Sequence, residues 1–279
     1  MAKIAFLTMD AESFFDTSCI KKLNVVPDER YNCAEQIKVF ADMMKERGAV
    51  GTFFAVTDFL PQCAEYLEYA KSLGSEIALH AKEHIEPTKL QADELSEELS
   101  GAISRLSQVL GSAPRGYRAP CFNTNDEVLK RIKAAGFSYD ASLRSAKNDK
   151  RKLEKVCDVV YKDGDFYEFS LNKERILGKE FVVSGGGYLR FLPFFIVKKR
   201  IKRIIERGGE FVLYVHPFEL YEGKLPKIKG LMPHERFFIN FRRKNYKKHI
   251  EYILDMLKDS GYKFMTMSEY VDGVAANKK

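Results

Sequence analysis

The chain is organised around the stretch Ile77-Ala78-Leu79-His80-Ala81-Lys82-Glu83-His84. Its first three residues continue a short apolar run typical of a buried strand, and two of the five histidines follow four positions apart. Two imidazoles at this spacing can point the same way on one turn and close on one cation of the zinc type. A histidine pair that only caps or solvates a loop would show the same spacing, so the rest of the chain has to decide.

The N-terminal run at residues 4–9 also fits a buried strand, and it leads directly into Asp10 and Glu12. Either carboxylate could join the two histidines. Three protein ligands leave a fourth position open for water, which is the pattern of catalytic rather than structural zinc. We therefore expect His80, His84 and one of Asp10 or Glu12 to hold a divalent metal ion.

Short apolar runs alternate with amphipathic helical patterns along most of the chain, which indicates βα units around a mainly parallel sheet. Strands are expected at residues 3–9, 49–56, 76–79, 114–120, 137–140, 210–215 and 262–267. Helices are expected at residues 32–47, 61–73, 91–110, 126–135, 191–207 and 246–257. A chain of 279 residues, 45% of them hydrophobic, can bury one large core, so we expect a single α/β barrel domain over residues 1–279.

The composition argues against several classes of protein. The net charge of +7 attracts anions in general, but no zinc finger, RNP-type strand or helix-turn-helix pattern accompanies it, so nucleic-acid binding is not expected. No apolar run approaches the roughly 18 residues that span a bilayer, and no export-signal pattern precedes the first strand. These two observations predict a cytoplasmic protein. Five cysteines without CxxC spacing predict reduced thiols.

Ionisable side chains lie at the carboxyl ends of the expected strands: Asp10, Glu12, His80, His84, Arg118, Asp140 and His216. In an α/β barrel one pocket can collect all of them, because the active site forms at that face. The set suits metal-assisted hydrolysis, with a carboxylate to accept the proton of water and a histidine to protonate the leaving group. Arg118 would keep its carboxylate partner ionised, and Asp140 would orient His216 and raise its pKa.

Five separated motifs, in order, resemble those of the polysaccharide deacetylases, the carbohydrate esterase family 4 proteins with a chitooligosaccharide-deacetylase-like domain. They are Thr8-Met9-Asp10-Ala11-Glu12, His80-Ala81-Lys82-Glu83-His84, Arg118-Ala119-Pro120, Asp140-Ala141-Ser142 and Leu213-Tyr214-Val215-His216-Pro217. The runs at 185–193 and 216–219 look like the subgroup linked to bacterial exopolysaccharide and exosortase systems. The resemblance extends from Lys3 to about Val271. It implies a distorted (β/α)7–8 barrel and the hydrolysis of an N-acetyl group from an amino sugar.

The resemblance also implies a role for each matching residue. Asp10 matches the base, Arg118 the arginine that positions it, His216 the acid and Asp140 the partner that orients this acid. His80 and His84 match the metal histidines, with zinc as the first choice and cobalt, nickel or iron as alternatives. The backbone after Arg118, at Cys121 or Phe122, would face the oxyanion.

The first motif departs from the family pattern, which has two adjacent aspartates. Ala11 occupies the second position here, and Glu12 follows one residue later. Similarity to relatives with an Asp-x-Glu arrangement assigns Glu12 as the third metal ligand. Other relatives have lost the metal and act on purine-derived amides, so this route stays open.

We therefore expect a metal-dependent sugar N-deacetylase that acts on an N-acetylated sugar or glycan precursor in surface-polysaccharide synthesis. The alternatives are an amidase on a small non-sugar amide and a catalytically silent glycan-binding barrel. Two basic segments have two interpretations each. Residues 194–207 form either a solvated barrel helix or a peripheral membrane contact. A charged loop or a wall that binds an anionic sugar would explain the cluster of Arg236, Arg242, Arg243 and Lys244 beside Phe237, Phe238 and Phe241. No pattern indicates the oligomeric state.

Overall fold

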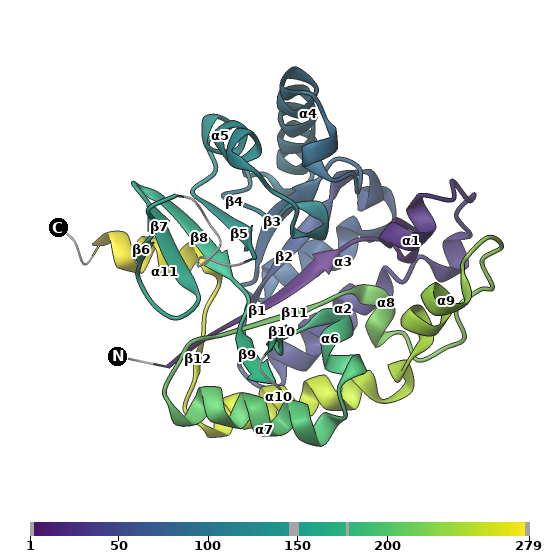
Figure 1. Cartoon of the computed structure of the whole chain (residues 1–279). Helices are drawn as coiled ribbons and strands as arrows, with labels where there is room; N and C mark the ends of the chain where they lie inside the picture. The colour runs from purple at the N-terminus through teal and green to yellow at the C-terminus, as the bar shows by residue number, and fades with distance from the viewer. Residues whose placement is uncertain (1–2, 145–150, 177–178, 277–279) are drawn as a thin grey trace.

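The computed structural model describes residues 3–144, 151–176 and 179–276 of the chain (Figure 1). In the first half, strands alternate with helices. The order is β1 (Ile4–Ala11), α1 (Ser18–Lys21), α2 (Glu35–Lys45), β2 (Gly51–Val56), α3 (Leu60–Ser72), β3 (Glu76–Ala81), α4 (Ala92–Leu110), β4 (Gly116–Tyr117), α5 (Asp126–Ala134) and β5 (Tyr139–Leu143). This is the βα pattern that the hydrophobic periodicity predicts.

The second half begins with short strands and returns to longer helices. The order is β6 (Glu154–Lys155), β7 (Val160–Asp163), β8 (Phe166–Ser170), β9 (Lys173–Ile176), β10 (Lys179–Val182), α6 (Gly186–Phe191), α7 (Phe194–Glu206), β11 (Phe211–Val215), α8 (Pro217–Leu220), α9 (Pro233–Asn240), α10 (Tyr246–Asp259), β12 (Lys263–Phe264) and α11 (Met267–Ala276). Strands β9 and β10 form a separate antiparallel hairpin.

The described strands of the large sheet are ordered β11-β1-β2-β3-β4-β5-β8-β7-β6, with β12 also paired to β1. Pairing is parallel from β11 to β8 and antiparallel from β8 to β6. Met9 of β1 is paired with Val215 of β11 on one side and with Phe53 of β2 on the other. The curled parallel sheet with helices around it confirms the predicted distorted α/β barrel (Figure 1).

Several predicted elements differ in their extent. The strand expected at 137–140 is β5 at Tyr139–Leu143, and the strand expected at 262–267 pairs only over Lys263–Phe264. The helix expected at 191–207 begins at Phe194 as α7, because Pro193 disfavours a helical conformation at Leu192, whose φ and ψ are −79° and 145°. The strand expected at 114–120 pairs only over Gly116–Tyr117, and Pro120 begins the short 3-10 turn η5 (Pro120–Phe122). Among the described residues, no helix is long and apolar enough to cross a bilayer.

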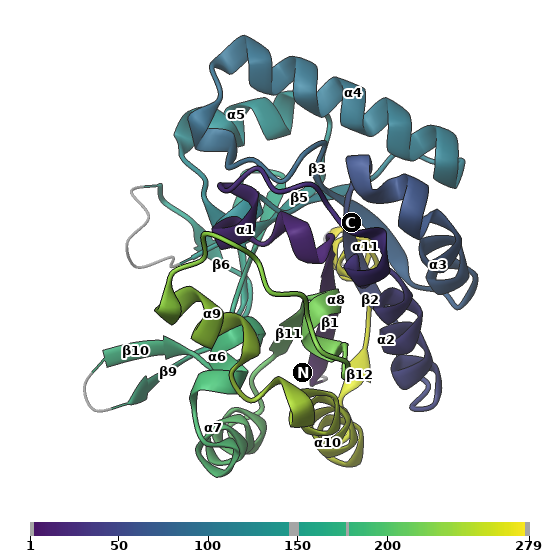
Figure 2. The ribbon, with the colours of Figure 1, turned by 90° about the vertical axis from the view of Figure 1, so that its right-hand side faces the viewer.

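Strand alternation divides the core into two parts. In β1, Leu7 and Met9 pack between the sheet and the outer helices, whereas Phe6 packs on the inner face with Phe54 of β2. The inner face of β1 continues through Thr8 to Asp10. Figure 2 looks onto the end of the molecule where β1 and β11 finish, among α1, α6, α8 and α9. The candidate site lies at this end.

Candidate active site

Strand β1 supplies two carboxylates to one cleft. Asp10 lies on the inner face of β1, while Ala11 is fully buried in the outer core. The backbone turns directly afterwards, because the Glu12 amide donates to the carbonyl of Asp10 at 3.0 Å. Glu12 thereby points into the cleft that Asp10 also lines. Ala11, at the place of the second aspartate in the family motif, points away from this cleft.

Glu12 lies against both histidines of the predicted metal site. Its Oε2 atom is 2.9 Å from His84 Nε2 and 3.6 Å from His80 Nε2. One ligand atom from each of the three residues lies within 4.8 Å of the others. His80 lies on β3 and His84 on the bend after it rather than on a helical turn. The structure thus brings the three predicted ligands together, and it places Glu12 rather than Asp10 beside the histidines.

The donor set fits a divalent cation. The Nδ1–H of His80 donates to the carbonyl of Arg118 at 2.7 Å, so the lone pair of its Nε2 atom is directed toward Glu12. The Oε2 atom of Glu12 is buried, and although His84 Nε2 lies 2.9 Å away, no described residue gives it a hydrogen bond of normal geometry. Burial alone would raise the pKa of Glu12, but His84 and His80 hold it well below its usual range. Two imidazole nitrogens and one ionised carboxylate are a normal zinc ligand set.

Arg118 fixes the second carboxylate, Asp10. Its Nη1 atom donates to Asp10 Oδ1 at 2.6 Å and to Thr8 Oγ1 at 3.0 Å, and its Nε donates to the carbonyl of Ala141 at 3.2 Å. The guanidinium is fully buried and lies 4.0 Å from the ring centre of Phe54. These contacts leave Asp10 Oδ2 directed toward the cleft, at 3.9 Å from His216 Nε2.

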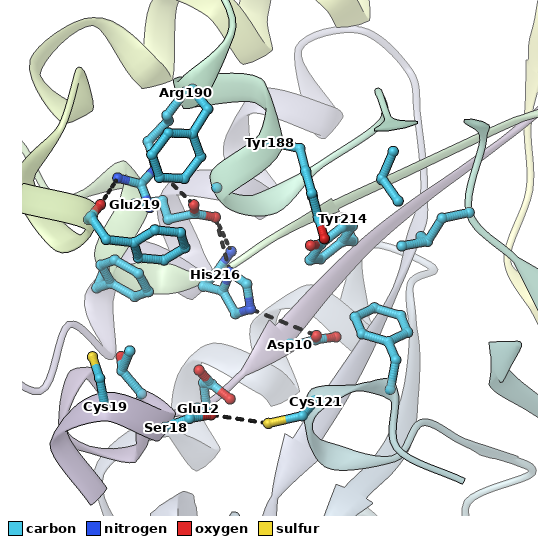
Figure 3. Close-up of a pocket in the computed structure, with 18 of the residues that line it drawn as sticks. Asp10, Glu12, Ser18, Cys19, Cys121, Tyr188, Arg190, Tyr214, His216 and Glu219 are labelled. Atoms are coloured by element: carbon cyan, nitrogen blue, oxygen red, sulfur yellow. Dashed lines mark hydrogen bonds and ion pairs between the residues drawn. The ribbon is translucent and has the colours of Figure 1, made fainter. Parts of the chain in front are cut away.

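His216 lies at the end of β11 and is oriented by Glu219. Its Nδ1 atom is 3.0 Å from Glu219 Oε2, and Glu219 Oε1 accepts from Arg190 Nε at 3.0 Å. Burial lowers the pKa of His216, but the carboxylates of Glu219, Glu12 and Asp10 together outweigh it and raise the pKa to about 9. The imidazole is therefore held in its charged form near neutral pH, with Nε2–H facing Asp10 (Figure 3).

The predicted pairing of Asp140 with His216 is wrong. Asp140 accepts hydrogen bonds from the hydroxyl of Ser142 at 2.6 Å and from its amide at 3.0 Å. Tyr139 and Ala141 pack in the inner core, so Asp140 between them faces the outer side of the sheet. Burial raises its pKa to about 6. Because β5 continues to Leu143, this carboxyl lies within the strand rather than at its end.

Two residues of the site, Glu219 and Arg190, were not predicted. Glu219 stands three residues after His216 and accepts from the His216 backbone amide at 3.1 Å, so the two residues form a capping box at the start of α8. This start of a helix can be predicted from the sequence, which has a polar residue at the N-cap, a proline at the first helical position and a glutamate at the third. Arg190 comes from α6, and no local pattern links it to α8.

The five predicted residues Asp10, Glu12, His80, His84 and His216 line one cavity of about 900 Å³. Cys121 also lines it, with its Sγ 3.0 Å from Ser18 Oγ (Figure 3). Cys121 and Phe122 have left-handed φ angles of 57° and 54°. The amide of Phe122 already donates to the carbonyl of Ala119 at 2.9 Å, which leaves the amide of Cys121 as the candidate oxyanion donor.

Aromatic side chains form much of the remaining wall of this cavity. They are Phe122, Phe181, Tyr188, Phe191, Tyr214, Phe218, Phe237 and Phe238. Tyr188, Phe191, Phe237 and Phe238 are each more than a third exposed. Exposed rings at the mouth of a cleft are suited to stacking against the apolar faces of a ligand.

Comparisons with known proteins agree with this geometry. A family model described as polysaccharide deacetylase matches residues 22–139, and one described as a domain of unknown function (DUF3473) matches residues 141–272. A peptidoglycan deacetylase-like protein of Gibberella zeae is 33% identical over 70 residues, which are 25% of this chain and 21% of that protein. A peptidoglycan deacetylase of Helicobacter pylori is 27% identical over 105 residues, or 36% and 34%. The chain thus spans about a third or less of these relatives.

Solved structures share the fold over almost the whole chain. A protein from Mycobacterium smegmatis assigned as a polysaccharide deacetylase is 19% identical, with a TM-score of 0.66 over 99% of this chain and 92% of that chain. A family 4 pseudoenzyme from Bacillus anthracis is 12% identical, with a TM-score of 0.55 over 97% of this chain and 66% of that chain. At these identities the likeness shows the fold alone, so catalysis has to be argued from the site.

Proposed function

We propose that this chain is a metal-dependent hydrolase that removes an N-acetyl group from an amino sugar, in keeping with the match of residues 22–139 to the polysaccharide deacetylase family model. The observation that supports this is the convergence of two chemical groups in one cleft. Glu12, His80 and His84 form a metal-binding group, and Asp10 and His216 form a proton-transfer pair beside it. A glycan-binding barrel without catalysis would need neither.

Glu12 Oε2 and the Nε2 atoms of His80 and His84 would hold the cation, with zinc as the first candidate. When bound, a cation of this type supplies a water of lowered pKa and polarises the acetyl carbonyl. The hydrogen bond from His80 Nδ1 to Arg118 fixes the ring orientation that this role needs.

Asp10 is the group placed to accept the proton of the attacking water. Its Oδ1 atom accepts a hydrogen bond from Arg118, and its Oδ2 atom stays available on the cleft side. The amide of Cys121 would donate to the oxygen of the acetyl carbonyl as negative charge develops there.

His216 is the group placed to protonate the leaving nitrogen. Glu219 binds its Nδ1 side, so the proton to be donated is on Nε2, which faces the cleft. The raised pKa keeps this proton in place at neutral pH. Bond cleavage then releases acetate and a free amino sugar.

Metal analysis of the purified full chain tests the first half of this proposal. We expect one equivalent of zinc or another divalent transition metal, lost in Glu12→Ala and His80→Ala. His249 packs on Phe194 at 3.9 Å between ring centres, away from the cleft, so His249→Gln is the matched histidine control and should keep the metal. Absence of stoichiometric metal in the unaltered chain would end the metal mechanism.

Acetate release from N-acetylated glucosamine oligomers tests the second half. The metal-loaded chain should release acetate, and His216→Ala should reduce the rate strongly while retaining the metal. A metal-loaded chain that binds these oligomers without releasing acetate would instead be a silent glycan-binding barrel. Ammonia or amine release from purine-derived amides, without acetate release from sugars, would identify the amidase alternative. The cytoplasmic location, the role in surface-polysaccharide synthesis and a membrane contact through residues 194–207 stay predictions.

A further inference from the structure

A second cavity, of about 560 Å³, lies on the opposite side of helix α9 from the catalytic cleft. Residues 234, 235, 237 and 238 line the cleft, whereas residues 236, 239 and 240 line the second cavity. The loop at residues 222–228 and the short turn η7 (Arg243–Asn245) supply the other walls. Helix α9 is therefore a partition between the two cavities, visible beside α6 and α8 in Figure 2.

The second cavity is strongly basic. One carboxylate, Glu222, faces five cationic side chains: Lys224, Lys227, Arg236, Arg243 and Lys244. Within the described part of the chain, none of these five cations forms a salt bridge with an acidic side chain. Four of them are exposed and solvated, so their charge alone would not define a site.

Arg243 distinguishes this cavity from an ordinary basic surface. Its side chain lines the cavity, yet the residue is only 8% exposed. The Nη2 atom donates to the carbonyl of Gly223 at 2.6 Å, whereas Nε and Nη1 have no hydrogen-bond partner among the described residues. A buried guanidinium normally has a counter-charge, because desolvating an unpaired cation is costly.

The neighbouring buried arginine shows the contrast. Arg190 donates to Glu219 and to the backbone carbonyls of residues 238, 239 and 241 at the end of α9. Arg243 has no such carboxylate, and the charge of Arg190 acts against it. The described chain thus supplies no carboxylate to Arg243, and its Nε and Nη1 atoms are left for a group that enters the cavity.

We propose that this cavity binds the phosphate group of a small phosphate-bearing anion, with Arg243 at its base and the lysines at its rim. The planar guanidinium fork matches phosphate oxygens, and the flexible lysines supply further charge. The volume exceeds that of one phosphate and falls in the range of small-molecule sites. This explains the basic cluster at residues 236–244 without reference to the deacetylase reaction.

A ligand in the second cavity would also contact elements that line the catalytic cleft. Phe14 lines the second cavity two residues after Glu12, and its ring lies 6.0 Å from the ring of Phe218, which lines the catalytic cleft. Together with α9, this packing gives a phosphate-bearing ligand two contacts with elements of the catalytic cleft.

Thermal unfolding of the full chain with inorganic phosphate tests the proposal, with chloride added to match ionic strength. Phosphate at tenfold its dissociation constant should raise the Tm by about 2–3 °C. Lys227→Gln/Lys244→Gln should weaken phosphate binding at least tenfold, and Arg243→Gln should abolish it if that variant folds. The double variant alters only exposed side chains, so the test does not depend on Arg243→Gln.

Two control variants establish whether phosphate binds in this cavity or elsewhere on the protein. Lys248→Gln/Lys258→Gln removes the same charge from exposed positions of α10 outside the cavity and should keep the phosphate effect. His80→Ala removes one of the proposed metal ligands and should also keep the effect of phosphate on the Tm. Phosphate binding that survives Lys227→Gln/Lys244→Gln, or that disappears in His80→Ala, would overturn the proposal. The proposal would also be overturned if the chain sedimented with phosphatidylglycerol vesicles while inorganic phosphate left its Tm unchanged. The cations would then bind a lipid surface.

Discussion

Replacing Glu219 by glutamine should move the pH dependence of the reaction, because this carboxylate holds His216 in its charged form. Glu219 Oε2 lies 3.0 Å from His216 Nδ1 and is the largest influence that raises the pKa of the imidazole. Glutamine keeps the shape and removes the charge. Burial of His216 continues to lower the pKa, so we expect it to fall to its ordinary value of 6.5 or below.

The size of the effect follows from the two protonation equilibria. At pH 7.5 a group with a pKa of about 9 is roughly 97% protonated, whereas one with a pKa of 6.5 is roughly 9% protonated. If His216 acts as the acid, kcat/KM at this pH should fall about tenfold. The loss should shrink as the pH is lowered toward 5.5, where both enzymes carry the proton. A bound cation offsets the influence of Glu12, so the basic limb of the metal-loaded enzyme should lie below pH 9.

The assay is the pH profile of kcat/KM for acetate release, whose basic limb reports the acid of the free enzyme. Glu97→Gln, at an exposed carboxylate of α4 that lines neither cavity, is the matched control and should leave the basic limb in place. Thermal melts would identify any loss of folded protein, since Glu219 also neutralises the buried Arg190. A Glu219→Gln enzyme with an unchanged basic limb, or with an equal loss at every pH, would refute the assignment of His216 as an acid tuned by Glu219.

Three further predictions follow from the same contacts. Asp140→Asn should leave the basic limb of the profile where it is, because Asp140 binds Ser142 and not His216; a shift like that of Glu219→Gln would instead support a pairing of Asp140 with His216. Arg118→Lys should lower kcat/KM at least tenfold at all pH values, since one ammonium cannot contact Thr8, Asp10 and the Ala141 carbonyl together; wild-type kinetics would contradict this. Removal of zinc by a chelator should lower the Tm by about 7 °C if the metal is present at 1,000 times its dissociation constant, and Glu12→Ala should show no such response in the same melts.

The sequence predicted the group of Glu12, His80 and His84 because each of these residues lies at or just after the end of a strand that the local pattern indicates. Asp10 and Glu12 follow an apolar strand, and His80 lies on the inner face of the next strand but one in the sheet. Parallel strands bring their carboxyl ends to one edge of the sheet, so a carboxylate after β1 and the histidines at the end of β3 are expected to lie close together. The choice between Asp10 and Glu12 depended on the backbone turn at Ala11, which no periodicity indicates.

The partner of His216 was predicted incorrectly, because that choice depends on where a strand ends and on tertiary packing. Asp140 was expected at the end of its strand, but β5 continues for three more residues and directs the carboxyl to the outer face. The true partner, Glu219, is fixed by Arg190 of α6, about thirty positions earlier in the chain. Only the capping box at His216 and Glu219 was available from the sequence, and its meaning needed the structure.

The division of the chain between two family models does not correspond to a division of the site. The residues proposed to hold a metal and to orient the base lie directly after β1, on and after β3, and directly after β4, at or before residue 118. His216, Glu219 and Arg190 all lie within 141–272, the part matched by the domain of unknown function. Strand β11 pairs directly with β1, so His216 and Asp10 are carried by neighbouring strands of one sheet. The second region therefore carries the proposed acid and its buried charged partners, and we expect neither region to deacetylate a substrate without the other.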